Sequence, residues 1–175
     1  MKPLAAMTQI EVAAYVQTHL QERGINVVLS GGAAVSFFCE NRYVSADVDL
    51  VNMFEVRRAR IRAAMVEIGF IESGRYFKHP TSHIIVEFPS GPLTVGIEPV
   101  KEIQDVVLDT GTLRIISPTD SVKDRLAAYY HWGDEQCLYQ AVLIRDTVKI
   151  DFGEIERWSR GEGKEAEYKV FLERK

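Results

Sequence analysis

Cysteine is scarce in this chain, and the few cysteines present are not arranged as ligands. Cys39 and Cys137 are the two cysteines among 175 residues, and they lie far apart without C-x-x-C spacing. The sequence therefore predicts neither a disulfide framework nor a zinc site. Reduced cysteines of this kind are typical of a cytoplasmic protein, which is the location we expect.

The chain also lacks an excess of positive charge. It has 21 Lys and Arg against 25 Asp and Glu, for a formal net charge of -4. Broad binding to duplex nucleic acid depends on a dense basic surface, so we do not expect it here. A local basic patch is compatible with this composition.

Long apolar runs are missing as well. The N-terminal segment, residues 1–16, contains Gln9 and Glu11, and no other segment has an apolar run long enough for a bilayer. We therefore expect neither a signal peptide nor a membrane span. With 46% hydrophobic and 26% charged residues, the composition is that of a globular domain with a proper core.

Residue patterning indicates an α/β region first. Thr8 and Glu11 have the spacing of a capping box, and they open a helix that we expect to end at Gly24. Strands are predicted at 25–30 and 46–51, with a short helix at 33–40 between them and a longer helix at 54–70 after them. Further strands are predicted for three apolar or alternating segments separated by Pro and Gly: 82–88, 93–100 and 112–117.

A helical region follows. Ser117 is a predicted N-cap, Pro118 stands at the first helical position, and Asp120 comes three residues after the cap. From there to residue 175 the chain is mostly helical by pattern. We therefore expect an α/β core over residues 1–116 and a C-terminal helical segment over 117–175, packed on that core.

Two short motifs carry possible chemistry. Gly31 and Gly32 separate a predicted strand from a predicted helix, and glycines there leave backbone N–H groups open to an anion at the helix N-terminus. Asp47 and Asp49 are two residues apart on a predicted strand, so both carboxylates face the same side. Adjacent anions repel unless a cation neutralises them, and Mg²⁺ prefers carboxylates together with phosphates. A plain turn and a solvated strand edge are the alternative interpretations of these two motifs.

Glu87 is a third candidate. It follows three β-branched residues and lies on the face opposite to Val86 and Phe88. If its strand neighbours the Asp pair, three carboxylates converge and could hold two metal ions.

These segments, in this order, resemble the nucleotidyltransferase superfamily typified by DNA polymerase β. That pattern is a hydrophobic strand, Gly-Gly or Gly-Ser, a short helix, an acidic pair, and a third acid flanked by hydrophobic residues. The resemblance covers roughly residues 25–88. More narrowly, the chain is similar to small bacterial proteins of the group that includes the abortive-infection toxin nucleotidyltransferases, which carry a lysine-bearing helix after the core.

The resemblance implies a fold and an activity. The fold would be a nucleotidyltransferase-like mixed β-sheet with flanking helices. The activity would be Mg²⁺-dependent transfer of a nucleoside monophosphate from an NTP to a hydroxyl. The implied roles are metal binding and catalysis by Asp47, Asp49 and Glu87, and nucleotide binding by Gly31, Gly32 and Lys123. A solvated helix lysine is the alternative interpretation of Lys123.

Other interpretations remain open. The acceptor could be a small molecule, a protein side chain or a tRNA end. The chain could instead be a noncatalytic binding or regulatory protein with this fold, such as half of a toxin–antitoxin pair, or an α/β domain of unrelated fold that binds a sugar or cofactor. Two further clusters have functional and structural interpretations. The arginines at 57, 58, 60 and 62 could contact phosphates or face solvent, and the aromatic run at 129–132 could stack on a base or pack on the core.

Overall fold

The computed structural model describes residues 2–175. After a 3-10 turn at Leu4–Ala6, helix α1 (Gln9–Gln21) begins at Thr8, which forms the predicted capping box with Glu11. Gly24 has φ +67, and the next amide, that of Ile25, returns to the carbonyl of Leu20. This C-terminal cap turns the chain directly into the first strand.

A seven-stranded mixed sheet forms the centre of the fold, in the order β3-β4-β5-β2-β1-β9-β8. The pairs β1–β9 and β2–β5 are parallel and the others are antiparallel. The strands are β1 (Val27–Ser30), β2 (Asp47–Asn52), β3 (Ile71–Ser73), β4 (Tyr76–Lys78), β5 (Ile85–Glu87), β8 (Ile103–Leu108) and β9 (Gly111–Ile116). A separate hairpin pairs β6 (Thr94–Val95) with β7 (Glu98–Pro99).

Helices pack against this sheet and bury its apolar residues. Helix α1 packs on β9, β1 and β2, and α3 (Arg58–Glu67) packs on α1 and β3. Val48, Leu50 and Val86 are fully buried because alternation turns them away from the polar side chains of the same strands. Helix α2 (Gly31–Phe38) follows β1 without a connecting loop and packs on β1 and β2.

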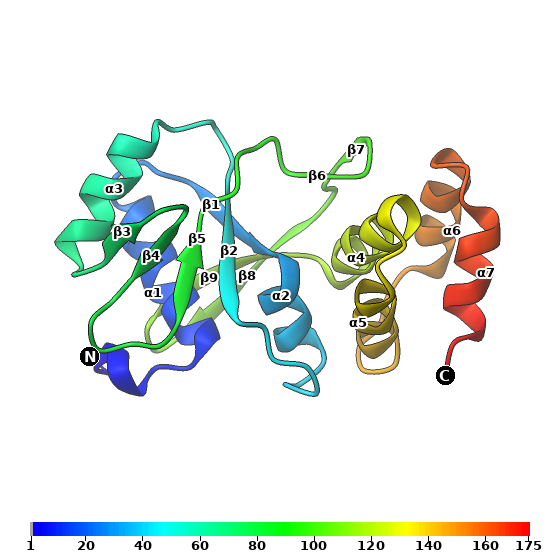
Figure 1. Cartoon of the computed structure of the whole chain (residues 1–175), viewed down its shortest axis with the longest axis horizontal. Helices are drawn as coiled ribbons and strands as arrows, with labels where there is room; N and C mark the ends of the chain where they lie inside the picture. The colour runs from blue at the N-terminus through cyan, green and yellow to red at the C-terminus, as the bar shows by residue number, and fades with distance from the viewer. Residues whose placement is uncertain (1) are drawn as a thin grey trace.

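Four helices complete the chain: α4 (Pro118–Trp132), α5 (Glu135–Arg145), α6 (Phe152–Gly161) and α7 (Glu165–Glu173). Ser117 caps α4 through the amide of Asp120, as predicted. In Figure 1 these helices gather at one end of the molecule, with α3, β3 and β4 at the other. Trp158 and Phe171 are fully buried and anchor the C-terminal helices.

The structure confirms the predicted α/β class and changes some elements. The helix predicted at 54–70 is shorter at both ends: α3 spans Arg58–Glu67, Glu55 before it has a positive φ of 50, and Phe70 beyond it is buried in the core. The strand predicted at 93–100 is folded back on itself at Gly96 as the β6–β7 hairpin. Strands β3, β4 and β8 were not expected from the pattern.

Among residues 2–175, no helix is both long enough and apolar enough to cross a membrane.

Candidate active site

Strand pairing brings three acidic side chains together on one face of the sheet. Antiparallel pairing of β1 with β2 sets Ser30 opposite Asp49, and parallel pairing of β2 with β5 sets Asp49 opposite Glu87. Asp47 lies two residues before Asp49 on β2 and therefore on the same face. Each functional side chain thus comes from a regular strand.

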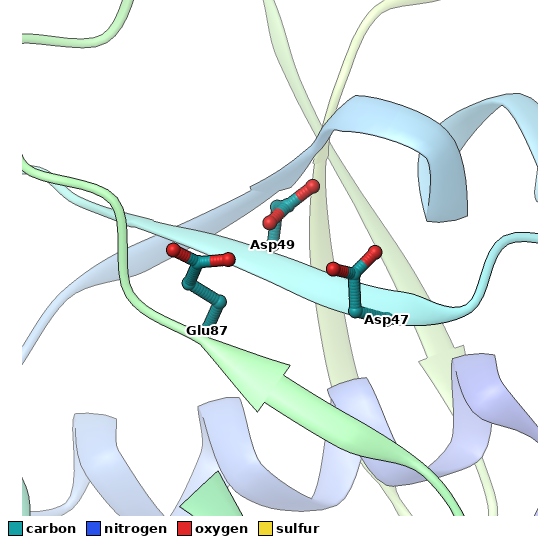
Figure 2. A group of neighbouring side chains, drawn as sticks. All are labelled: Asp47, Asp49 and Glu87. Carbon is teal, nitrogen blue, oxygen red and sulfur yellow. The ribbon is translucent and has the colours of Figure 1, made fainter. Parts of the chain in front are cut away.

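The three carboxylates form a compact cluster. Asp47, Asp49 and Glu87 are half-buried, and each has a potential ligand atom within 4.8 Å of the others. Figure 2 shows the three side chains pointing toward the same space from β2 and β5. The sequence predicted that the three carboxylates would converge if the strand of Glu87 neighboured the Asp pair. The structure has this strand order, and the carboxylates converge.

Mutual repulsion and burial act most strongly on Asp49. Burial, followed by the charges of Asp47 and Glu87, raises the pKa of the Asp49 carboxyl to about 6. On the outer side of the cluster, Arg75 Nε lies 3.4 Å from Glu87 Oε1. The charge of Arg125 acts to lower the pKa of Asp49, and that of Asp124 acts to raise it. The arginines offset the acids only in part, and the remaining negative charge favours a cation.

Gly31 connects this cluster to a helix N-terminus. It is the first residue of α2, has φ +66, and is so close to Asp49 that an added Cβ would collide with the carboxylate Oδ2. A Cβ on Gly32 would come within 2.6 Å of Ser45 Oγ. The two glycines thus let the N-terminus of α2, which favours anions, lie directly beside the acids. Gly31 lies on the same side of the sheet as Asp49 and Asp47, whereas opposite sides would have favoured an α/β domain of unrelated fold.

Contacts that the sequence did not reveal support Asp47. Gln9 Nε2 donates to the backbone oxygens of Ser45 (3.2 Å) and Asp47 (2.9 Å), and Ser45 Oγ donates to Asp47 Oδ1 at 3.3 Å. Gln9 comes from α1, so nothing in the local sequence of β2 pointed to it. These bonds hold the entrance to β2 in place.

A cavity of about 310 Å³ opens from the acids. Its polar lining includes Gly31, Asp49, Glu87, Asp124 and Arg125. Its apolar lining is mainly aliphatic, with residues from β2, from the segment after β5, from the β6–β7 hairpin and from β9. Charged and aliphatic residues therefore line the same cavity.

Lys123 requires a correction. Its side chain is fully buried, and Nζ forms ion pairs with Asp120 Oδ1 (2.8 Å) and Glu154 Oε1 (3.1 Å) between α4 and α6. The lysine does not line the cavity, so neither predicted interpretation, phosphate contact or solvated side chain, fits it. A buried ammonium needs paired anions, and the docking of α6 supplies one of them.

Arg125 is the cation of α4 that reaches the cavity. Successive helical residues are about 100° apart, so positions 123 and 125 face nearly opposite directions. The Arg125 guanidinium contacts Asp124 Oδ2 (Nε, 3.0 Å) and Gln140 Oε1 (3.4 Å). Pairing with Asp124 keeps its pKa raised in spite of burial, the largest influence, which acts to lower it. The helical period shows that Lys123 and Arg125 lie on opposite sides of α4. The sequence alone does not show which of these sides faces the cavity.

Most residues of the other two candidate clusters have partners away from the cavity. Arg58 and Arg62 pair with Glu72, and Arg60 donates to the backbone oxygen of Arg23. In the aromatic run, Tyr130 is buried and stacked on Trp158. Trp132 at the end of α4 is 79% exposed and does not line the cavity.

The donor set suits a hard divalent cation. Carboxylate oxygens are the ligands that Mg²⁺ prefers, and it normally completes its coordination with waters and substrate phosphates. Asp47, Asp49 and Glu87 are therefore the residues that could hold Mg²⁺, and Gly31 and Arg125 line the cavity beside Asp49 and Glu87.

Comparison with known proteins supports the fold. No family model matches the sequence, and no curated protein matches it. Among solved structures, the chain is similar to an antigenic nucleotidyltransferase-like protein from Paracoccidioides brasiliensis, with TM-score 0.57 and 13% identity over 78% of this chain and 75% of that one. It is also similar to the antibiotic-resistance factor ANT(2'')-Ia, with TM-score 0.53 and 14% identity over 89% of this chain and 91% of that one. The chain thus has a nucleotidyltransferase-like fold.

Proposed function

We propose that this protein is a Mg²⁺-dependent nucleotidyltransferase that moves a nucleoside monophosphate from an NTP to a hydroxyl of an acceptor. The observation that carries the proposal is the convergence of Asp47, Asp49 and Glu87 beside Gly31, at the N-terminus of α2. A cation site and an anion site in direct contact are what a metal–triphosphate complex requires. The nucleotidyltransferase-like fold supports the same proposal.

Mg²⁺, as one or two ions held by the three carboxylates, would neutralise phosphate charge and lower the pKa of the attacking hydroxyl. The chain's own groups would do the rest. The open backbone of Gly31 and Gly32 and the guanidinium of Arg125 would hold the β- and γ-phosphates. Asp49 and Glu87 would lie nearest the attacking hydroxyl.

The reaction would be an in-line displacement at the α-phosphorus. The acceptor oxygen forms a bond to that phosphorus, and the bond from phosphorus to the bridging oxygen of the β-phosphate breaks. Pyrophosphate leaves with the bonding electrons. The hydroxyl proton passes to a carboxylate, for which we assign Glu87 as general base.

The acceptor class stays open between a small molecule, a protein side chain and a tRNA end. ANT(2'')-Ia is an antibiotic-resistance factor, which gives a small molecule one precedent on this fold. A likeness to abortive-infection toxins, a place in a bacterial toxin–antitoxin pair and a cytoplasmic location are further parts of the proposal. We also propose that residues 1–116 form a nucleotidyltransferase-like core and residues 117–175 a C-terminal helical segment packed on it.

Labelled nucleotides test the proposal. The protein is incubated with Mg²⁺, NTPs labelled at the α-phosphate, and cell extract separated into small-molecule, protein and RNA fractions. We expect wild type to label one fraction and Asp47→Ala/Asp49→Ala to label none. Wild type that binds Mg²⁺–NTP but labels no fraction would favour the alternative of a noncatalytic protein with this fold.

A further inference from the structure

The face of the sheet that carries the acidic cluster continues beyond Glu87 onto β4. Antiparallel pairing of β4 with β5 sets Tyr76 opposite Glu87 and Lys78 opposite Ile85. Residues directly opposite each other in neighbouring strands point to the same face, so Tyr76 and Lys78 share the face of Glu87. Phe77, between them, is fully buried on the other face. The acids therefore lie at one border of a surface that extends across β4.

The outer part of this face is open to solvent. Figure 1 shows β5, β4 and β3 extending from β2 on the side away from α2, the helix that packs on β1 and β2. Lys78 is exposed, and so are the side chains of Arg75 in the β3–β4 turn and of Ile71 on the edge strand. We call this surface the outer sheet face, and its residues are Ile71, Ser73, Arg75, Tyr76, Lys78 and Ile85. A molecule that approaches Glu87 across β4 contacts this face.

The outer sheet face is locally positive in a chain whose net charge is -4. Within residues 2–175 Lys78 has no ion-pair partner, and Arg75 Nε lies 3.4 Å from Glu87 Oε1 at the border of the acidic cluster. Glu72, the acid of β3, is on the other face, where it pairs with Arg58 of α3. When bound Mg²⁺ neutralises the cluster, as the proposed function requires, these cations attract an anionic acceptor and repel a polycationic one.

Arg75 and Tyr76 form a flat stacked pair on this face. The Arg75 Cζ atom lies 4.8 Å from the centroid of the Tyr76 ring, and Nη2 donates to the Tyr76 hydroxyl at 2.5 Å. Aromatic rings and arginine guanidinium planes are the surfaces on which unpaired bases of a nucleic acid stack. A stacking surface together with a free lysine suits a base and a phosphate, which are the two parts of a nucleic-acid strand.

We propose that the outer sheet face binds the acceptor and that the acceptor is the 3′ end of a single-stranded RNA. This inference rests on the proposed function, because the terminal ribose hydroxyl would be the attacking group. The preceding base stacks on Arg75 and Tyr76, and Lys78 contacts a backbone phosphate. Ends with unstacked bases are typical of RNA, whereas the acidic chain as a whole is unsuited to duplex binding.

The transfer step then lengthens the RNA by one nucleotide. The 3′ oxygen of the RNA forms a bond to the α-phosphorus of the NTP, and the bond from that phosphorus to the β-phosphate bridging oxygen breaks. Pyrophosphate leaves with the bonding electrons, and the hydroxyl proton passes to Glu87. An RNA whose 3′ hydroxyl is replaced by a phosphate has no attacking group and should not be lengthened.

Binding to the face is measured by fluorescence anisotropy with a labelled, unstructured RNA of about ten nucleotides in the presence of Mg²⁺. The salt dependence of Kd counts phosphate contacts, at about 0.7 in the slope of log Kd against log salt for each contact to a single strand. We expect Lys78→Ala to lower that slope by about 0.7. Lys169→Ala is the matched control, because Lys169 is also exposed, has no ion-pair partner within the described residues and lies on α7 at the other end of the molecule.

A second pair of variants tests stacking without changing charge. Tyr76→Leu removes the ring, and we expect it to weaken RNA binding by at least about fivefold with the salt slope unchanged. Tyr76→Phe keeps the ring and should bind within about twofold of wild type. Thermal unfolding shows whether each variant is folded. If Tyr76→Leu is unfolded, Arg75→Ala replaces it, since it removes the guanidinium plane from an exposed side chain and should also weaken binding.

Transfer and binding together decide between the possible outcomes. With NTPs labelled at the α-phosphate, we expect wild type to add one labelled nucleotide to the RNA and none to the 3′-phosphate form. The inference is overturned if Lys78→Ala and Lys169→Ala change the salt slope equally, if folded Tyr76→Leu binds RNA as wild type does, or if DNA of the same sequence is lengthened in place of RNA.

Failure of the inference is distinguishable from failure of the proposed function. Wild type that binds Mg²⁺–NTP but not RNA, or that labels a small molecule or a protein and not RNA, overturns the RNA acceptor and leaves the proposed function in place. Wild type that binds RNA but not Mg²⁺–NTP contradicts the proposed function and, with it, the assignment of RNA as the acceptor.

Discussion

Asp49 and Glu87 lie opposite each other on the parallel strands β2 and β5, and Gly31 approaches Asp49 so closely that its missing side chain is what makes room for the carboxylate. The acidic cluster is therefore built by sheet register rather than by a loop. Register is fixed by the buried apolar face of the same strands, where Val48, Leu50 and Val86 pack. The same apolar packing therefore stabilises the core and sets the geometry of the site.

Replacing Asp49 by Asn should stabilise the fold. Asp49 has its folded-state pKa raised to about 6, so its ionised form lowers the free energy of unfolding at pH 7.5. We expect Asp49→Asn to increase that free energy by about 1–3 kcal/mol at pH 7.5, with the difference vanishing near pH 3. Urea unfolding at both pH values measures it. Asp109→Asn, at an exposed turn, should change stability by less than about 0.5 kcal/mol, and an equal gain in both variants would contradict the explanation.

The affinity of the site for Mg²⁺ should increase with pH, which is the opposite of the effect that ionisation of Asp49 has on stability. A raised pKa means that protons compete with the cation, so Mg²⁺ affinity should be full above pH 7 and fall as the pH drops through about 6. The decline should approach about tenfold per pH unit for one proton released. Calorimetric Mg²⁺ titrations from pH 5 to 8 test this. Affinity that is constant over that range would show that Asp49 is not a ligand.

Gly31→Ala should weaken Mg²⁺ binding more than Gly133→Ala does. Both Gly31 (φ +66) and Gly133 (φ +65) adopt the left-handed conformation, which costs an alanine about 1–2 kcal/mol. A Cβ at Gly133 meets open space, whereas one at Gly31 meets the Asp49 carboxylate. Gly133→Ala should therefore keep Mg²⁺ binding, and Gly31→Ala should lose it. Equal Mg²⁺ affinity in the two variants would refute the close approach.

We expect Lys123 to be a structural residue and Arg125 to be a ligand-binding residue. Lys123→Met leaves Asp120 buried without its cation, which should cost about 3–5 kcal/mol of stability. Arg125→Ala should weaken tripolyphosphate binding about tenfold through loss of a charge-assisted bond, at a smaller cost in stability. Chemical unfolding and calorimetry on both variants test the assignment. It is wrong if Arg125→Ala binds tripolyphosphate as wild type does.

Local signals in the sequence were sufficient for the elements nearest the site. The capping box at Thr8, the cap at Ser117 and the alternation that sets Asp47 beside Asp49 depend on neighbouring residues, so one sequence shows them. Strands β3, β4 and β8 escaped prediction because they are short or largely exposed and lack a strong apolar pattern.

Nonlocal packing decided the rest. The sequence could propose Glu87 only on the condition that its strand neighbours β2, because the residues of one strand do not determine the order of strands in a sheet. The role of Lys123 depended on where α6 docks, because its partner Glu154 is 31 residues further along the chain. Gln9 supports Asp47 from a different helix, and Trp158 of α6 donates to the backbone oxygen of Val95 in the β6–β7 hairpin.

The most direct test of the central claim is a Mg²⁺ and NTP titration by calorimetry on wild type and on Asp47→Ala/Asp49→Ala, with thermal unfolding to show that both are folded. Nucleotide binding by wild type that requires Mg²⁺ and disappears in the folded double variant is the predicted result. Binding that is equal in the two proteins, or absent from well-folded wild type, would contradict a metal–triphosphate site at Asp47, Asp49 and Glu87.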